Sequence, residues 1–273
     1  MNPEKYTRLD PARFQRIAEL QDSGQFEEVI RESQAALRET TDPNEQASLL
    51  IDGINASEFV GQLREARQML DKLKRLHIPD VESRLNAEFC EPVLLTWEEK
   101  LKEGVAAFAA MLQRHGELLR QPDFRYLYER IHSRRALALV ELERFTEALP
   151  IAQEAVRFSF DNQEEEQSIY FSLAVCLDET GDLESAKKEF IRVIGFGIKN
   201  GLEENARYRL AKLYFLTGGF AQARQQLETI VRDHPKGDFV VARKNLYEAL
   251  SQTYRQLGDI VNAERYMDLA RKS

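Results

Sequence analysis

The hydrophobic and polar positions of the chain follow a helical period that a turn interrupts at regular intervals. In the clearest stretch, Gly181 follows one helical pattern and precedes another, which runs through residues 183–194. Glycine readily takes the left-handed conformation that ends a helix. The stretch therefore predicts an antiparallel helical hairpin. The apolar stripe of its first helix consists of Tyr170, Leu173, Ala174 and Leu177.

The same turn returns twice further along the chain. Residues 180–186 read Thr-Gly-Asp-Leu-Glu-Ser-Ala, residues 217–223 read Thr-Gly-Gly-Phe-Ala-Gln-Ala, and residues 257–263 read Leu-Gly-Asp-Ile-Val-Asn-Ala. A fourth copy lies upstream, with Arg135 where the others have leucine and Glu143 where glycine is expected. A unit that recurs at this length indicates a repeat protein.

Alanines near the start of each second helix give the length of the repeat. Ala148, Ala186, Ala223 and Ala263 are separated by 38, 37 and 40 residues. Small residues at these positions let the two helices of a hairpin approach closely. We expect a large side chain there to overpack the crossing.

The N-terminal half shows the pattern less clearly. Residues 1–78 predict two divergent hairpins, and residues 80–120 predict a degenerate one, because Pro92 interrupts its first helix and Gly104 falls within its second. Residues 123–273 predict four clearer hairpins. We expect residues 1–273 to form a single solenoid domain. The core of the degenerate hairpin is assigned to Trp97, Phe108, Met111 and Leu112.

The repeats resemble the tetratricopeptide repeat. The resemblance rests on small and large apolar residues in each first helix, on Gly-x-apolar-x-x-Ala across the turn, and on Pro235 after a second helix, and it covers residues from about 125 to 273. It implies an all-α fold, an α-solenoid of stacked antiparallel helix hairpins forming a right-handed superhelix, whose concave side binds peptides or protein segments. The units exceed the usual length of about 34 residues, as in bacterial peptide-sensing regulators and large signalling scaffolds.

Charge and cysteine content narrow the partner and the compartment. The chain has 46 acidic and 38 basic residues and a formal charge of −8, which disfavours nucleic acid as the main partner. The two cysteines, Cys90 and Cys176, lie beside apolar residues in helical segments, which favours buried thiols in a reducing compartment over a disulfide. Residues 1–6 lack the pattern of a secretory signal, and no apolar run reaches membrane-spanning length. We expect a cytoplasmic protein without membrane insertion.

No motif points to catalysis. The glycine-rich segment 195–201 follows a helix rather than a strand, so it predicts a loop between repeats rather than a phosphate-binding loop. Four scattered histidines have no metal-ligand spacing and are expected in loops or on the surface. We therefore expect a protein that is not an enzyme and has no metal and no cofactor.

Candidate binding residues are those one or two turns from the packing positions of the first helices. Arginine, aromatic and asparagine side chains suit peptide recognition, although packing against the next repeat is the alternative for each. Arg130 and Arg134 share a helix face, where they either grip an acidic peptide or form a solvated surface. The candidate groove residues are Arg130, Arg134, Phe171, Asn205, Tyr208, Arg209, Lys212, Asn245 and Gln252.

Three functions remain open from the sequence. The first is a non-enzymatic interaction module or scaffold that holds a protein segment or peptide in its concave groove. The carboxylate clamp known from the family is not reproduced at Phe14, Ala18 and Asp52, which disfavours chaperone-tail binding. The second is a peptide-sensing regulator that changes partner binding on ligand capture, and the third is a structural subunit that self-assembles through its end repeats. A monomer is favoured over an assembly.

Overall fold

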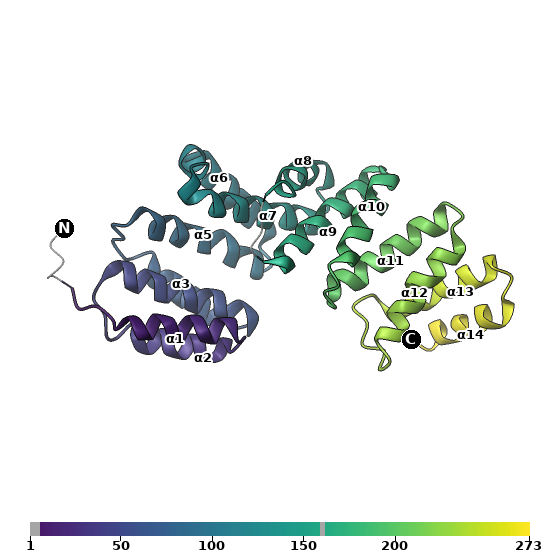
Figure 1. The fold of residues 1–273 in the computed structure, drawn as a ribbon, viewed down its shortest axis with the longest axis horizontal. Helices are drawn as coiled ribbons and strands as arrows, with labels where there is room; N and C mark the ends of the chain where they lie inside the picture. Colours follow the sequence, from purple (N-terminus) through teal and green to yellow (C-terminus); the bar gives the residue numbers. More distant parts are fainter. Residues whose placement is uncertain (1–5, 159–161) are drawn as a thin grey trace. The chain divides into compact units, whose positions relative to one another are not determined.

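The computed structural model describes residues 6–158 and 162–273, and their regular structure is helical, with no strand among these residues. The chain divides into two compact units, unit 1 (Met1–Leu142) and unit 2 (Glu143–Ser273). The all-α fold expected from the sequence is confirmed (Figure 1). The helices of unit 1 are α1 (Pro11–Asp22), α2 (Phe26–Ala36), α3 (Pro43–Phe59), α4 (Leu63–Leu73), α5 (Val81–Trp97), α6 (Leu101–Leu119), the 3-10 helix η2 (Pro122–Phe124) and α7 (Arg125–Glu141). Those of unit 2 are α8 (Phe145–Ala155), α9 (Gln163–Thr180), α10 (Leu183–Gly195), α11 (Gly201–Leu216), α12 (Phe220–Asp233), α13 (Arg243–Gln256) and α14 (Ile260–Arg271).

Successive helices pack as antiparallel hairpins within each unit, and we call the odd-numbered helices first helices and the even-numbered ones second helices. Unit 1 ends with α7 and unit 2 begins with α8, so the boundary lies at Leu142 and Glu143, within the fourth of the repeats expected from the sequence. The assignment of residues 1–273 to a single solenoid domain stays a prediction.

The turn from a first to a second helix has the same backbone conformation throughout the described part. Each of these turns contains one residue with positive φ. At Gly181 φ is 91°, and the next amide, of Asp182, donates to the carbonyl of Leu177 at 2.9 Å, which closes the end of α9. The residues with positive φ at these turns are Gly24, Gly61, Glu99, Glu143, Gly181, Gly218 and Gly258.

Two of these turns keep the conformation without glycine. Glu143 has a φ of 57° and Glu99 a φ of 60°. A side chain in the left-handed region costs roughly 1–2 kcal/mol. The turn is therefore kept at positions 99 and 143 although the local sequence does not favour it.

The alanines of the second helices are fully buried. Ala186, Ala223 and Ala263 each expose none of their surface. In the last hairpin the hydroxyl of Ser251 donates to the carbonyl of Ala263 at 2.7 Å, which shows how closely α13 and α14 approach. The expected crossing positions are therefore confirmed.

The degenerate hairpin of unit 1 is more regular than the sequence indicates. The expected interruption at Pro92 is wrong, because α5 runs through Pro92 without a break. Gly104 has a packing role: a methyl group added there would lie 2.8 Å from Cγ2 of Thr96 and 3.2 Å from the carbonyl oxygen of Pro92. Phe108 and Met111 are buried as expected, whereas Trp97 and Leu112 are only partly buried.

The structure also shows the glycine-rich segment, the two cysteines and the histidines. The glycine-rich segment joins α10 to α11, and the Asn200 side chain caps α11 by accepting from the amides of Leu202 and Glu203. The two cysteines are free and buried. The expectation that all histidines lie in loops or on the surface is wrong for His132, which is buried in α7 with Nδ1 3.0 Å from the carbonyl oxygen of Tyr128.

Candidate functional site

The first helices of unit 2, α9, α11 and α13, carry seven of the nine candidate residues and an apolar cavity. The cavity has a volume of about 250 Å³ and lies at the contact of α11 with α12 and α13. Lys212 and Gln252, two of the candidate residues, lie on its border. The residues that line it are Ala211, Lys212, Phe215, Leu216, Leu227, Ala249, Gln252 and Thr253.

The apolar character of this cavity continues onto the surface. Leu216, at the last turn of α11, is 70% exposed, whereas Leu227 at the floor is buried. Phe215 is half-buried and packs edge-on against Phe220, with ring centroids 5.3 Å apart. The cavity is therefore bordered at the surface by one exposed apolar side chain, Leu216.

The polar residues around the cavity differ in how far they are engaged within the protein. Lys212, Asn245 and Gln252 are exposed, and Lys212 forms no ion pair with a described residue. Tyr208 is half-buried, and burial, with the nearby Glu248 carboxylate as a smaller cause, raises the pKa of its hydroxyl. These four side chains remain candidates for contact with a partner.

Three other candidates of unit 2 are engaged in contacts within the unit. Nη1 of Arg209 lies 2.9 Å from a carboxylate oxygen of both Asp178 and Glu179. Asn205 donates to the carbonyl of Gly201 at 2.9 Å, within its own helix. Phe171 packs edge-on against Phe190, with ring centroids 6.2 Å apart.

The two candidate arginines of unit 1 are also engaged. Nη1 of Arg134 lies 3.4 Å from Oε1 of Glu58 on α3, and burial, the largest influence on this carboxyl, raises the pKa of Glu58. The guanidinium of Arg130 lies over the ring of Phe89 at 4.9 Å from its centroid. Arg130 and Arg134, which their sequence positions assign to a groove, therefore contact neighbouring helices instead.

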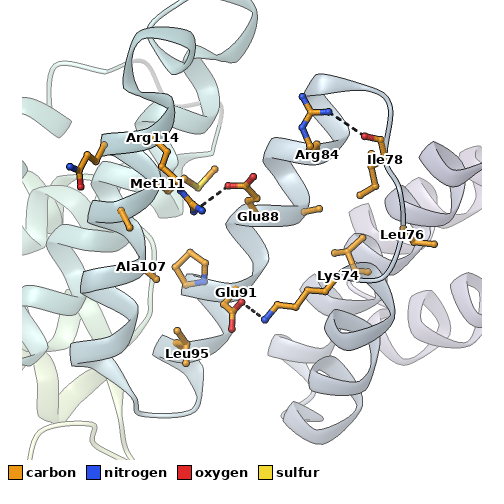
Figure 2. Close-up of a pocket in the computed structure, with 15 residues that line it drawn as sticks. Lys74, Leu76, Ile78, Arg84, Glu88, Glu91, Leu95, Ala107, Met111 and Arg114 are labelled. Carbon is orange, nitrogen blue, oxygen red and sulfur yellow. Dashed lines mark hydrogen bonds and ion pairs between the residues drawn. The ribbon is translucent and has the colours of Figure 1, made fainter.

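A larger cavity lies in unit 1, and sequence reasoning did not find it. Its volume is about 800 Å³, and α5 forms its floor, with α6 on one side and the end of α4 with the following connection on the other (Figure 2). Its lining combines apolar and charged side chains. Only the spacing of Ala107, Ala110, Met111 and Arg114 along one face of α6 gave a signal in the sequence.

The described residues contain neither a cluster of metal ligands nor a membrane-spanning helix. Among them, no three histidine, cysteine or acidic side chains come together as metal ligands. No helix in this part of the chain is long and apolar enough to cross a membrane. Catalytic residues were not expected, and none is assigned.

Comparison with known proteins identifies the repeat. Two family models described as tetratricopeptide repeat match residues 167–196, which span α9 and α10, and residues 205–237, which span most of α11, α12 and the following loop. A comparison with curated protein sequences gives no match.

Solved structures share the fold of the chain. A tetratricopeptide repeat protein from Parabacteroides merdae is 14% identical at a TM-score of 0.55, with 96% of this chain and 91% of that chain covered. PilF of Pseudomonas aeruginosa is 16% identical at a TM-score of 0.63, with 84% and 92% covered. A signal transduction ATPase with a tetratricopeptide repeat sensor from Pyrococcus horikoshii is 15% identical at a TM-score of 0.73, with 95% of this chain but 41% of that chain covered. At these identities the likeness is one of fold.

Proposed function

The chain is a tetratricopeptide-repeat protein, and from this premise we propose that it is a non-enzymatic interaction module that holds an extended segment of a partner protein against α11 and α13 of unit 2. The observation that carries the proposal is the apolar cavity bordered by Lys212, Gln252 and the exposed Leu216. Protein recognition is the general use of this repeat fold, and the cavity supplies the specific place.

The size of the cavity supports a single apolar anchor. At about 250 Å³ it lies below the range of pockets that hold drug-sized ligands. Interfaces concentrate their binding energy in a few side chains that fill well-packed pockets. We propose that one leucine, methionine or phenylalanine of the partner enters the cavity and covers Leu216.

The polar residues around the cavity favour an extended segment with an acidic residue next to the anchor. The exposed amides of Asn245 and Gln252 each offer both a donor and an acceptor to a peptide backbone. Lys212 offers a charge that no described carboxylate pairs, whereas Arg209 is already paired with Asp178 and Glu179. Lys212 is therefore the cation that we expect to select the partner.

The test is a selection of random 12-residue peptides displayed on phage against the full chain, followed by fluorescence anisotropy with the enriched peptides. We expect Leu216→Glu and Lys212→Glu to weaken binding by about tenfold or more. The matched control is Ile191→Glu, because Ile191 is 50% exposed on α10 and does not line the cavity. Enriched peptides that bind Leu216→Glu as tightly as the wild type would overturn the proposal.

A cytoplasmic location belongs to the same proposal. Both Cys90 and Cys176 are free and buried, which suits a reducing compartment. The net charge of −8 favours a protein partner over nucleic acid.

Self-assembly is a second candidate function, supported by exposed apolar residues on the last hairpin. Val261 is 78% exposed and Ile260 is 51% exposed, both at the start of α14. Light scattering over a range of concentrations tests this function. A mass that rises with concentration in the wild type and not in Val261→Glu would support it, and a constant monomer mass would exclude it.

A further inference from the structure

The large cavity of unit 1 is a groove along one face of α5. Its floor is formed by residues that follow one another at helical spacing, Arg84, Ala87, Glu88, Glu91 and Leu95. Figure 2 shows Arg84, Glu88, Glu91 and Leu95 along this helix. At a rise of 1.5 Å per residue, the eleven steps from Arg84 to Leu95 span about 16 Å, or three helical turns. The groove is therefore as long as a short helix.

The groove exists because α5 packs mainly against α3 and α6 and less closely against α4. The connection between α4 and α5 holds this arrangement. Ile78 in the connection is buried, and Nη1 of Arg84 donates to its carbonyl at 3.3 Å. Asp80 caps α5 by accepting from the amide of Ser83 at 2.7 Å. The opening between α4 and α6 is thus part of the folded unit.

The two carboxylates of the floor, Glu88 and Glu91, pair with side chains of both walls. On one side Glu88 lies 3.3 Å from Nη2 of Arg114 on α6, and on the other Glu91 pairs with Lys74 at the end of α4 (Figure 2). These pairs neutralise both carboxylates of the floor. Arg84, at the N-terminal end of the groove, is exposed and forms no ion pair with a described residue.

Between the ion pairs the cavity is lined by apolar side chains, several of them small. Ala107 and Ala110 on α6 and Leu76 in the connection are partly or fully exposed, and Pro92 lies at the floor. Pro92 has no amide hydrogen, so it cannot donate the helical hydrogen bond to the carbonyl of Glu88 four residues earlier. This carbonyl lies on the same side of α5. Small side chains in the walls leave room for the backbone of a partner.

We propose that this groove binds an amphipathic helix of a partner protein, with an apolar stripe of about three turns against the apolar lining between the ion pairs and an acidic residue paired with Arg84. Helices that dock in grooves use apolar anchors at i, i+3 or i+4 and i+7, and the three-turn length of this groove has room for such a stripe. The single positive charge left at one end sets the direction of the bound helix. This surface lies in unit 1 and is separate from the unit 2 surface proposed above.

The experiment uses the full chain and a phage library of 16-residue peptides with a fixed helical scaffold and varied surface positions. The enriched peptides are then measured by fluorescence anisotropy. Ala110→Trp fills the groove from an exposed position, and Ala106→Trp is its control, because Ala106 is exposed on the same helix and does not line the cavity. Thermal unfolding checks that both variants fold.

We expect enriched peptides with an apolar stripe and an acidic residue near one end. Ala110→Trp and Arg84→Glu should each weaken their binding by about tenfold or more. A lysine in place of the acidic peptide residue should restore binding to Arg84→Glu, whereas Ala106→Trp and the unit 2 variant Leu216→Glu should bind normally.

Three results would overturn the proposal. In the first, none of the enriched peptides binds less tightly to Ala110→Trp. In the second, peptides with a central proline that breaks the helix bind as tightly as the originals. In the third, a peptide with lysine in place of its acidic residue does not regain binding to Arg84→Glu. The Leu216→Glu variant separates this outcome from the proposed function, because its peptides and those of the groove depend on different residues.

Discussion

Asp52 on α3 carries a charge that the folded protein disfavours, and replacing it with asparagine is expected to stabilise unit 1. Burial raises the pKa of Asp52 to about 6, against a smaller lowering by the hydrogen bond from Gln21. The side-chain amide of Gln21 donates to Oδ1 of Asp52 at 3.2 Å, and the oxygen of an asparagine can accept the same bond. The substitution therefore removes the charge and keeps the acceptor.

The magnitude follows from the two pKa values. The unfolded chain titrates Asp52 near 3.9, about two units below the folded value, and each unit corresponds to about 1.4 kcal/mol. The full penalty of roughly 3 kcal/mol is present above pH 6 and disappears below pH 4, since the folded state binds the proton more tightly between these values. Wild-type stability at this site therefore rises as the pH falls from 6 to 4. Because the asparagine amide also needs a partner, we expect a gain of about 1–3 kcal/mol at pH 7.5.

The assay is urea unfolding followed by the fluorescence of Trp97, the one tryptophan of the chain, which lies in the same unit as Asp52. The stability difference between Asp52→Asn and the wild type should shrink to under about 0.5 kcal/mol at pH 4. Asp71→Asn, at an exposed position of α4, serves as the control and should change stability by less than about 0.5 kcal/mol at either pH. Equal stability of Asp52→Asn and wild type at pH 7.5, or a gain that persists at pH 4, would refute the reasoning.

Three further predictions concern the repeat turns, the hairpin crossings and the thiols. Glu143→Gly should raise the free energy of unfolding by about 1 kcal/mol, because glycine relieves the left-handed conformation, and a lower melting temperature would contradict this. Ala223→Leu should cost about 1–3 kcal/mol by overpacking the crossing of α11 and α12, so unchanged thermal unfolding would show that the crossing lies elsewhere. Burial raises the pKa of Cys90 to about 12 and that of Cys176 to about 11. Both thiols should therefore react with a disulfide reagent at pH 8 far more slowly in the native than in the urea-unfolded protein, and prompt native labelling would refute their burial.

The sequence predicted the features that depend on a few neighbouring residues. Gly181, Gly218 and Gly258 mark turns because the left-handed conformation is a local requirement, and an alanine such as Ala223 marks a crossing because only a small side chain fits there. Pro92 shows the limit of the local argument. A proline inside a helix costs about 3 kcal/mol, but the packing of α5 against α3 and α6 keeps the helix continuous.

The candidate site was harder to predict, because contacts between repeats decide which side chains remain available to a partner. Arg134 pairs with Glu58, 76 positions earlier, and Arg209 pairs with Asp178 and Glu179 on the preceding first helix. The helical period of the sequence does not predict ion pairs between residues so far apart in the chain. The exposed Leu216 beside a cavity is likewise invisible in a pattern that treats every leucine as a core residue.

The pairing of charges within the units suggests what the two proposed surfaces recognise. Most of the basic side chains around them, such as Arg209 in unit 2 and Arg114 in unit 1, already face carboxylates of their own unit. An exposed ion pair adds little to binding, because a partner must break it or leave it in place. What remains at each surface is an apolar hollow and one cation without an ion-pair partner among the described residues, Lys212 in unit 2 and Arg84 in unit 1. Apolar anchors should therefore supply most of the affinity, and a single acidic residue at a fixed distance from them should supply the register of each partner.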